Sequence, residues 1–149
     1  RPDFGAMVSR RVVLLCGPAG AGKTTAARES DLEVFDRDDE KWGSESQFKA
    51  AIHGLASDPN AQAVVIRSCP TSKSRTEVAA AIGATHTLLL LEDQRVLRDR
   101  IARRNRADKA NGLASLRVWF ARFDHADRAP LFTSWAALTE HVGVTSQEW

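Results

Sequence analysis

The chain has 149 residues, of which 43% are hydrophobic and 27% charged, and its formal net charge is +2 at pH 7. This length fits one domain with a sizeable core, and this composition excludes a disordered or fibrous protein. No apolar run approaches the roughly 20 residues that a membrane span needs, so we expect no membrane partner.

The start of the chain and its two cysteines carry expectations about processing and location. Residues 1–6 lack the apolar core of a secretory signal, and Met7 is the expected native start, with 1–6 left over from expression and 7–149 forming the domain. Cys16 and Cys69 are too few for a disulfide framework, and each ends or follows a strand-like run. We therefore expect a cytoplasmic protein with buried, reduced, structural thiols.

Strand and helix patterns alternate along the first two thirds of the chain. Capping boxes pair Ser44 with Gln47 and Ser74 with Glu77, and Gly83 suits a helix C-terminal cap. Repeated strand–helix units predict one α/β domain, with a parallel sheet and helices on both faces. The predicted strands are 12–16, 32–35, 63–66 and 88–91, and the predicted helices between them are 24–29, 44–55 and 74–82.

The last third of the chain is rich in arginine. A helix is predicted from Asp93 to about Asn105, followed by a polar loop at 106–112 and a short helix around Trp135. Residues 95–128 include ten basic and four acidic residues. This local excess of positive charge favours a polyanionic partner such as nucleotide phosphates or nucleic acid. One apolar helix face between the loop and the tail is expected in the core rather than stacked on bases, and its members are Leu116, Trp119, Phe120 and Phe123.

The strongest motif follows the first predicted strand, where the chain reads GPAGAGKTT. It satisfies G-x-x-x-x-G-K-[ST], whose glycines let backbone N–H groups surround phosphate oxygens without Cβ collisions. Lys23 is expected to reach the β- and γ-phosphates of ATP, and Thr24 to bind Mg²⁺ through its hydroxyl. This predicts a three-layer P-loop NTPase with a helical lid. The expected nucleotide-binding residues are Gly17, Pro18, Ala19, Gly20, Ala21, Gly22, Lys23, Thr24 and Thr25.

A P-loop leaves the reaction open. A GTPase needs the pattern N-K-x-D to recognise guanine. Residues 105–108 resemble this pattern but lack the lysine, which argues against a GTPase. A motor or switch ATPase needs an acidic pair at a strand end, and Glu92-Asp93 is a candidate for it. A nucleotide-binding interaction module is a further alternative. A kinase explains more of the sequence, because it needs an acceptor-side base, cations for the transferred phosphoryl group and a lid.

The stretch DRDDEKW, residues 36–42, supplies the acceptor-side carboxylates. It follows the second predicted strand, and so lies at the carboxyl edge of the sheet, where ligands bind in open α/β folds. Asp38 is the preferred general base for an attacking hydroxyl. Asp36 or Asp39 is the alternative, either as the base or as the group that holds water around Mg²⁺.

Four basic residues accompany these carboxylates. Arg37 and Lys41 are expected to orient the base or to hold an acceptor phosphate. Arg100 and Arg104 lie one turn apart on one helix face just before the polar loop, as lid cations would.

Over roughly 12–123 the chain resembles the small P-loop kinases typified by the kinase domain of bacteriophage polynucleotide 5′-hydroxyl kinase, together with related phage-encoded AAA-type, zeta-toxin-like ATPases. The resemblance is carried by GPAGAGKTT, DRDD and RDRIARRN. It implies that Lys23 and Thr24 hold ATP and Mg²⁺, that Asp38 is the base and that Arg104, with Arg100, is the lid cation. It also implies that Arg75 contributes to acceptor binding.

The resemblance implies transfer of the ATP γ-phosphate to a hydroxyl of DNA or RNA, most directly a polynucleotide 5′-hydroxyl, by a phage-encoded enzyme. A hydroxymethylated DNA base and a free nucleoside or other small molecule are the alternative acceptors. Two departures affect acceptor handling. Lys41 stands where the family commonly has arginine, and Ser68-Cys69-Pro70 replaces Asp-Thr-Asn.

Overall fold

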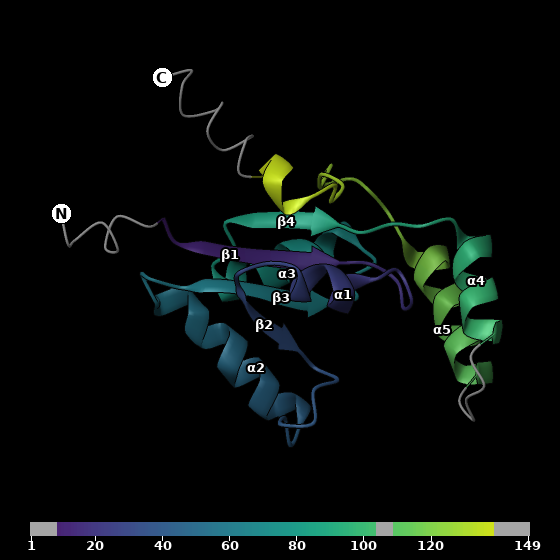
Figure 1. The fold of residues 1–149 in the computed structure, drawn as a ribbon, viewed down its shortest axis with the longest axis horizontal. Helices are drawn as coiled ribbons and strands as arrows, with labels where there is room; N and C mark the ends of the chain where they lie inside the picture. Colours follow the sequence, from purple (N-terminus) through teal and green to yellow (C-terminus); the bar gives the residue numbers. More distant parts are fainter. Residues whose placement is uncertain (1–8, 104–108, 139–149) are drawn as a thin grey trace.

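The computed structural model describes residues 9–103 and 109–138. Its centre is an all-parallel, four-stranded sheet with the strand order β2-β3-β1-β4, shown in Figure 1. The predicted parallel sheet is therefore confirmed. The strands are β1 (Arg11–Cys16), β2 (Glu33–Asp36), β3 (Gln62–Arg67) and β4 (His86–Leu89).

Helices cover both faces of the sheet. Alternate residues of β1 point to opposite sides, so Val12 and Leu14 pack in one apolar cluster while Val13 and Leu15 pack in another. The first cluster includes residues of α2 (Glu45–His53) and α3 (Ser72–Ile82), and the second includes residues of α1 (Lys23–Arg28) and of segment 132–138. The expected three-layer α/β/α arrangement is thus confirmed.

Local capping explains where the helices begin. The Ser44 hydroxyl accepts a hydrogen bond from the Gln47 amide at 3.0 Å, as predicted, and α2 continues into the 3-10 turn η2 (Gly54–Ser57). The capping box of α3 is formed by Thr71 and Ser74, so the predicted pairing of Ser74 with Glu77 is wrong and the helix begins earlier. Gly83 ends α3 in the left-handed conformation, as predicted.

Two helices, α4 (Gln94–Arg103) and α5 (Lys109–Arg122), lie side by side beyond the edge of the sheet (Figure 1). Leu97, Ile101 and Leu116 form the apolar contact between them. The predicted loop at 106–112 is wrong for 109–112, which is helical, and 106–108 lies outside the described residues. The fourth strand ends at Leu89 rather than at Leu91, because its partner β1 ends at Cys16.

The buried side chain of Arg75 ties α3 to the segment that follows α5. Its guanidinium makes two hydrogen bonds to the carboxylate of Asp127, at 2.9 and 2.7 Å, and further bonds to the carbonyl oxygens of Cys69, Pro70 and Asp124. All its donors are occupied and none of its surface is exposed. The prediction that Arg75 binds the acceptor is therefore wrong, since a substrate cannot reach a guanidinium saturated by the protein.

No helix among the described residues is long and apolar enough to span a membrane.

We predict that Arg75→Met lowers the free energy of unfolding by about 3 kcal/mol, because it leaves the Asp127 carboxylate and three carbonyl oxygens without their cation. Urea denaturation at pH 7 measures the effect. Arg117→Met, on an exposed position of α5, is the matched control and should stay within about 0.5 kcal/mol of the parent. Equal destabilisation by both variants would refute the structural role of Arg75.

The same pair predicts a pH dependence. Hydrogen bonds from Arg75 hold the pKa of Asp127 below its ordinary value. Because the folded-state pKa lies below the unfolded one, this stabilisation is complete above the unfolded pKa and is lost as pH falls through the folded pKa. The stability difference between the parent and Asp127→Asn should therefore shrink below about pH 4.

Candidate nucleotide and acceptor site

The loop between β1 and α1 has the conformation that its glycines were expected to permit. Gly20 and Gly22 have φ angles of 82° and 98°, in the left-handed region that L side chains rarely adopt. A Cβ on Gly17 would lie 2.3 Å from the carbonyl oxygen of Leu90, so only glycine fits there. The loop is thus a narrow backbone cradle of the kind that fits phosphate oxygens.

Lys23 opens α1 and lies across this cradle. Its ammonium donates a hydrogen bond to the carbonyl oxygen of Gly17. Burial lowers the pKa of Lys23, while the neighbouring Cys16 and Cys69 thiols and the carboxylates of Asp36 and Asp38 act in the opposite direction. The ammonium therefore occupies a confined position within the loop that would hold the phosphates.

The Thr24 hydroxyl donates a hydrogen bond of 2.7 Å to Oδ2 of Asp36, at the end of β2. A hydroxyl and a carboxylate side by side are hard oxygen donors, the type that Mg²⁺ prefers, so the residues present fit that ion. Oδ1 of Asp36 accepts the backbone N–H of Asp38 at 3.0 Å. Both oxygens of Asp36 are thus engaged, whereas no hydrogen bond to the Asp38 side chain occurs within residues 9–103 and 109–138.

These groups surround one cleft of about 790 Å³ at the carboxyl edge of the sheet. The structure therefore brings the P-loop, the acceptor-side carboxylates and a predicted lid arginine together. The lining residues are Ala19, Gly20, Gly22, Lys23, Thr24, Thr25, Asp36, Arg37, Asp38, Ile66, Arg67, Ser68 and Arg100.

Arg100 reaches the P-loop from α4. Its Nη1 donates to the carbonyl oxygen of Gly20 at 2.9 Å, and its Nη2 lies 3.6 Å from Glu92. Ala21 packs against the apolar cluster between α4 and α5, so the two helices touch the loop through both a polar and an apolar contact. Arg104, the other expected lid cation, lies outside the described residues.

Other predicted residues lie less directly in the cleft. Lys41 is exposed and does not line it, and its ammonium lies 4.9 Å from the ring centroid of Trp42. Gly17, Pro18 and Ala21 belong to the loop without lining the cleft. Cys16 and Cys69 are buried as predicted, and a hydrogen bond between the two thiols, with burial, raises the pKa of Cys16.

The sequence interpretation missed Arg67 and Glu45. Arg67 ends β3, and its Nη2 lies 2.9 Å from Oε2 of Glu45, whose Oε1 accepts from Arg37 Nε at 3.1 Å. The hydrogen bond from Arg67 is the main cause that lowers the pKa of Glu45. The sequence feature that could have indicated Arg67 is its position at the end of a predicted strand. Its place beside the cleft, however, follows only from the order of the strands in the sheet.

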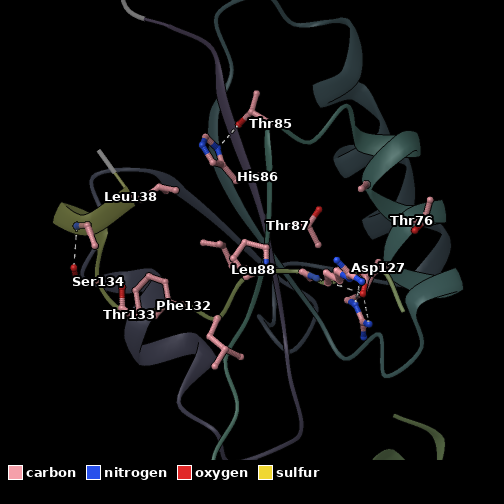
Figure 2. Close-up of a pocket in the computed structure, with 17 residues that line it drawn as sticks. Thr76, Thr85, His86, Thr87, Leu88, Asp127, Phe132, Thr133, Ser134 and Leu138 are labelled. Atoms are coloured by element: carbon pink, nitrogen blue, oxygen red, sulfur yellow. Dashed lines mark hydrogen bonds and ion pairs between the residues drawn. The ribbon is translucent and has the colours of Figure 1, made fainter. Parts of the chain in front are cut away.

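A second cavity, of about 670 Å³, runs along β4 between α3 and residues 127–138 (Figure 2). Thr85, His86 and Thr87 lie on its β4 side, and Phe132 and Leu138 lie opposite. Its lining residues include none of the P-loop and none of the DRDDEKW stretch. The chemistry expected from the sequence therefore belongs to the first cleft.

Comparisons with known proteins support this fold. No protein-family model matches the chain, and no curated protein matches it in sequence. Among solved structures, the chain is similar to an unliganded sugar kinase from Janibacter sp. HTCC2649, with 18% sequence identity and a TM-score of 0.58. The match covers 84% of this chain and 85% of that one. The predicted α/β/α fold with a parallel sheet is confirmed, and at this identity the likeness extends to the fold alone.

We predict that Lys23→Ala weakens ATP binding by about 10–100-fold, because the lost contact is a charge-assisted hydrogen bond to phosphate. Titration calorimetry with ATP and Mg²⁺ measures it. Lys73→Ala, which removes an exposed lysine of α3, should bind ATP as the parent does. Parental affinity in Lys23→Ala would show that the loop is not the nucleotide site.

Proposed function

We propose that this chain is an ATP- and Mg²⁺-dependent phosphotransferase that moves the γ-phosphate to a hydroxyl group of a second substrate. The observation that carries the proposal is the division of the two cleft aspartates. Asp36 is bonded to Thr24 of the P-loop, whereas Asp38, two residues on, lines the same cleft with a carboxylate that accepts no hydrogen bond from the residues the structure describes. One carboxylate beside the nucleotide and one facing an acceptor are what hydroxyl phosphorylation requires.

In this proposal Thr24 and Asp36 would hold Mg²⁺, which when bound would supply charge neutralisation at the phosphate oxygens. Lys23 and the backbone N–H groups of the loop position the β- and γ-phosphates. Asp38 accepts the proton of the acceptor hydroxyl as that oxygen attacks. Arg100, already against the loop at Gly20, stabilises the charge on the transferred group, and Arg104 remains a predicted second lid cation.

The geometry disfavours the alternative of a motor or switch ATPase. Its acidic pair was expected at Glu92-Asp93, but neither residue lines the cleft. Oδ1 of Asp93 accepts the backbone N–H of Arg95 at 2.7 Å in the first turn of α4, and Glu92 pairs with Arg100. These carboxylates are occupied in local structure, away from the place where an attacking water would be polarised.

For the acceptor we favour a small polyhydroxylated molecule over a polynucleotide end. Residues 36–45 contain five acidic and two basic residues, which would repel a phosphate backbone beside Asp38. The similar solved structure, whose length this chain matches, is a sugar kinase. A polynucleotide 5′-hydroxyl, or a modified base or nucleoside, is the second candidate. It is favoured by the arginines of α4 and α5.

The test is transfer of labelled phosphate from ATP to sugars, sugar acids, nucleosides, and DNA and RNA oligonucleotides with 5′-hydroxyl ends, with water as the reference. We expect transfer to an acceptor to exceed hydrolysis, because a closed kinase site excludes water. Rapid hydrolysis without any labelled acceptor would refute the phosphotransferase. Labelling of oligonucleotides alone would establish the second candidate.

We predict that Asp38→Asn slows transfer by about 10²–10⁴-fold at unchanged ATP affinity, because the variant keeps the side-chain size but loses the proton acceptor. Asp36→Asn should instead raise the Mg²⁺ concentration that is needed for half-maximal rate. Asp39→Asn is the matched control and should stay near the parental rate, since Asp39 does not line the cleft and its Oδ1 accepts the backbone N–H of Lys41 in a local turn. Single-turnover kinetics separate the three. A parental rate in Asp38→Asn with an inactive neighbour would reassign the base.

A further inference from the structure

The acceptor side of the cleft contains a cation that neither the P-loop nor the DRDDEKW stretch supplies. Arg67 is the last residue of β3, the strand that lies between β1 and β2. Its Cα pairs with that of Cys16, the residue that precedes the P-loop. Arg67 therefore lies between the nucleotide cradle on one side and the end of β2, with Asp38 just beyond it, on the other.

The protein holds this guanidinium in one place. The Arg67 side chain is 21% exposed, and its Nη2 is bonded to Glu45 at 2.9 Å. Its guanidinium carbon lies 5.3 Å from the ring centroid of Phe48, which is fully buried. An arginine fixed by an ion pair and a ring loses less conformational entropy when it binds a ligand than a free one would.

The charge of this cluster is not balanced. The Glu45 carboxylate pairs with Arg37, with Arg67 and, at 3.9 Å, with Lys49, so three cations share this one carboxylate, and the two guanidinium groups line the cleft. Within the described residues, each of the two donates one hydrogen bond to a protein group and keeps its other donors. Ion pairs with a carboxylate as exposed as Glu45 add little to the stability of the fold.

We propose that Arg67, together with Arg37, forms an anion subsite that selects a small hydroxyl acceptor carrying one compact anionic group, a carboxylate or a phosphate monoester. The inference rests on the proposed phosphotransferase function, because it names the substrate class of the same cleft. Guanidinium groups match the planar geometry of these anions through paired N–H donors. The exposed carboxylates of Asp39 and Glu40 nearby would repel a polyanion that extends beyond the two arginines. A ligand with one compact anionic group would avoid most of this repulsion.

The experiment uses the full chain and matched pairs of acceptors that differ in the anionic group alone. The pairs are glycerate against glycerol, gluconate against glucose, and ribose 5-phosphate against ribose. A 5′-hydroxyl DNA oligonucleotide is the polyanion arm. Steady-state transfer from labelled ATP gives KM and kcat, and titration calorimetry with a non-hydrolysable ATP analogue and Mg²⁺ gives acceptor binding without chemistry. The carboxylate and phosphate pairs separate the two sources of the anion.

In at least one pair of acceptors, we expect kcat/KM to be about 10–100-fold higher for the anionic member than for the neutral one. This factor corresponds to the free energy of two charge-assisted hydrogen bonds. Arg67→Gln should remove this preference, because it should raise KM for the anionic member far more than KM for its neutral partner. Arg67→Lys should lie between, since it keeps the charge without the planar fork. Arg28→Gln, an exposed arginine of α1 outside the cleft, makes the same charge change and should behave as the parent.

The other outcomes separate the subsite from the activity. Equal use of charged and neutral members, or an Arg67→Gln variant that slows both equally, overturns the subsite and leaves the phosphotransferase intact. Binding of the anionic member that depends on Arg67, without transfer, supports the subsite and overturns the phosphotransferase. Preference for the oligonucleotide overturns the small acceptor. Neither binding nor transfer with any pair overturns both.

Discussion

The parallel pairing of the strands is the constraint on which the site depends. Since all four strands run in one direction, their carboxyl ends meet at one edge of the sheet. The P-loop leaves β1 there, Asp36 ends β2 there and Arg67 ends β3 there. Residues far apart in the chain thus meet in one cleft, and Thr24 and Asp36, twelve positions apart, come within 2.7 Å.

The carboxylates at this edge are distinguished by their partners rather than by their residue type. Asp36 accepts from the Thr24 hydroxyl and from the backbone amide of Asp38, so both of its oxygens are engaged. Glu45 is shared between Arg37 and Arg67. The Asp38 side chain accepts no hydrogen bond within the described part of the chain, and on this difference the proposed role of Asp38 rests.

The hairpin of α4 and α5 is attached to both sides of this cleft. Arg100 and Ala21 join it to the P-loop, while Trp119 Nε1 donates to the carbonyl oxygen of Ser68 at 2.8 Å, on the acceptor side. The Arg75–Asp127 ion pair fixes the segment that leaves α5 against α3. A movement of α4 and α5 would therefore act on both sides of the cleft together, as the proposed phosphotransferase requires of a helical lid.

The sequence by itself determined what depends on near neighbours in the chain. The P-loop, the Ser44 cap of α2 and the Gly83 cap of α3 follow from side chains and backbone within a few residues, so local spacing was sufficient to predict them. The burial of β1 on both faces and the α/β class follow from hydrophobic pattern in the same way, because a continuous apolar run predicts a strand that is covered on both sides.

Only the tertiary structure decided what depends on distant partners. The sequence around Arg75 would look the same whether its side chain pointed into solvent or paired with Asp127. The structure shows that Arg75 is buried and pairs with Asp127. The Arg67–Glu45 contact spans 22 positions and requires the strand order, which no local pattern encodes. Long-range pairing is selected by the free energy of the whole packed core, and so the place of Arg67 beside the predicted carboxylates emerged only from the fold.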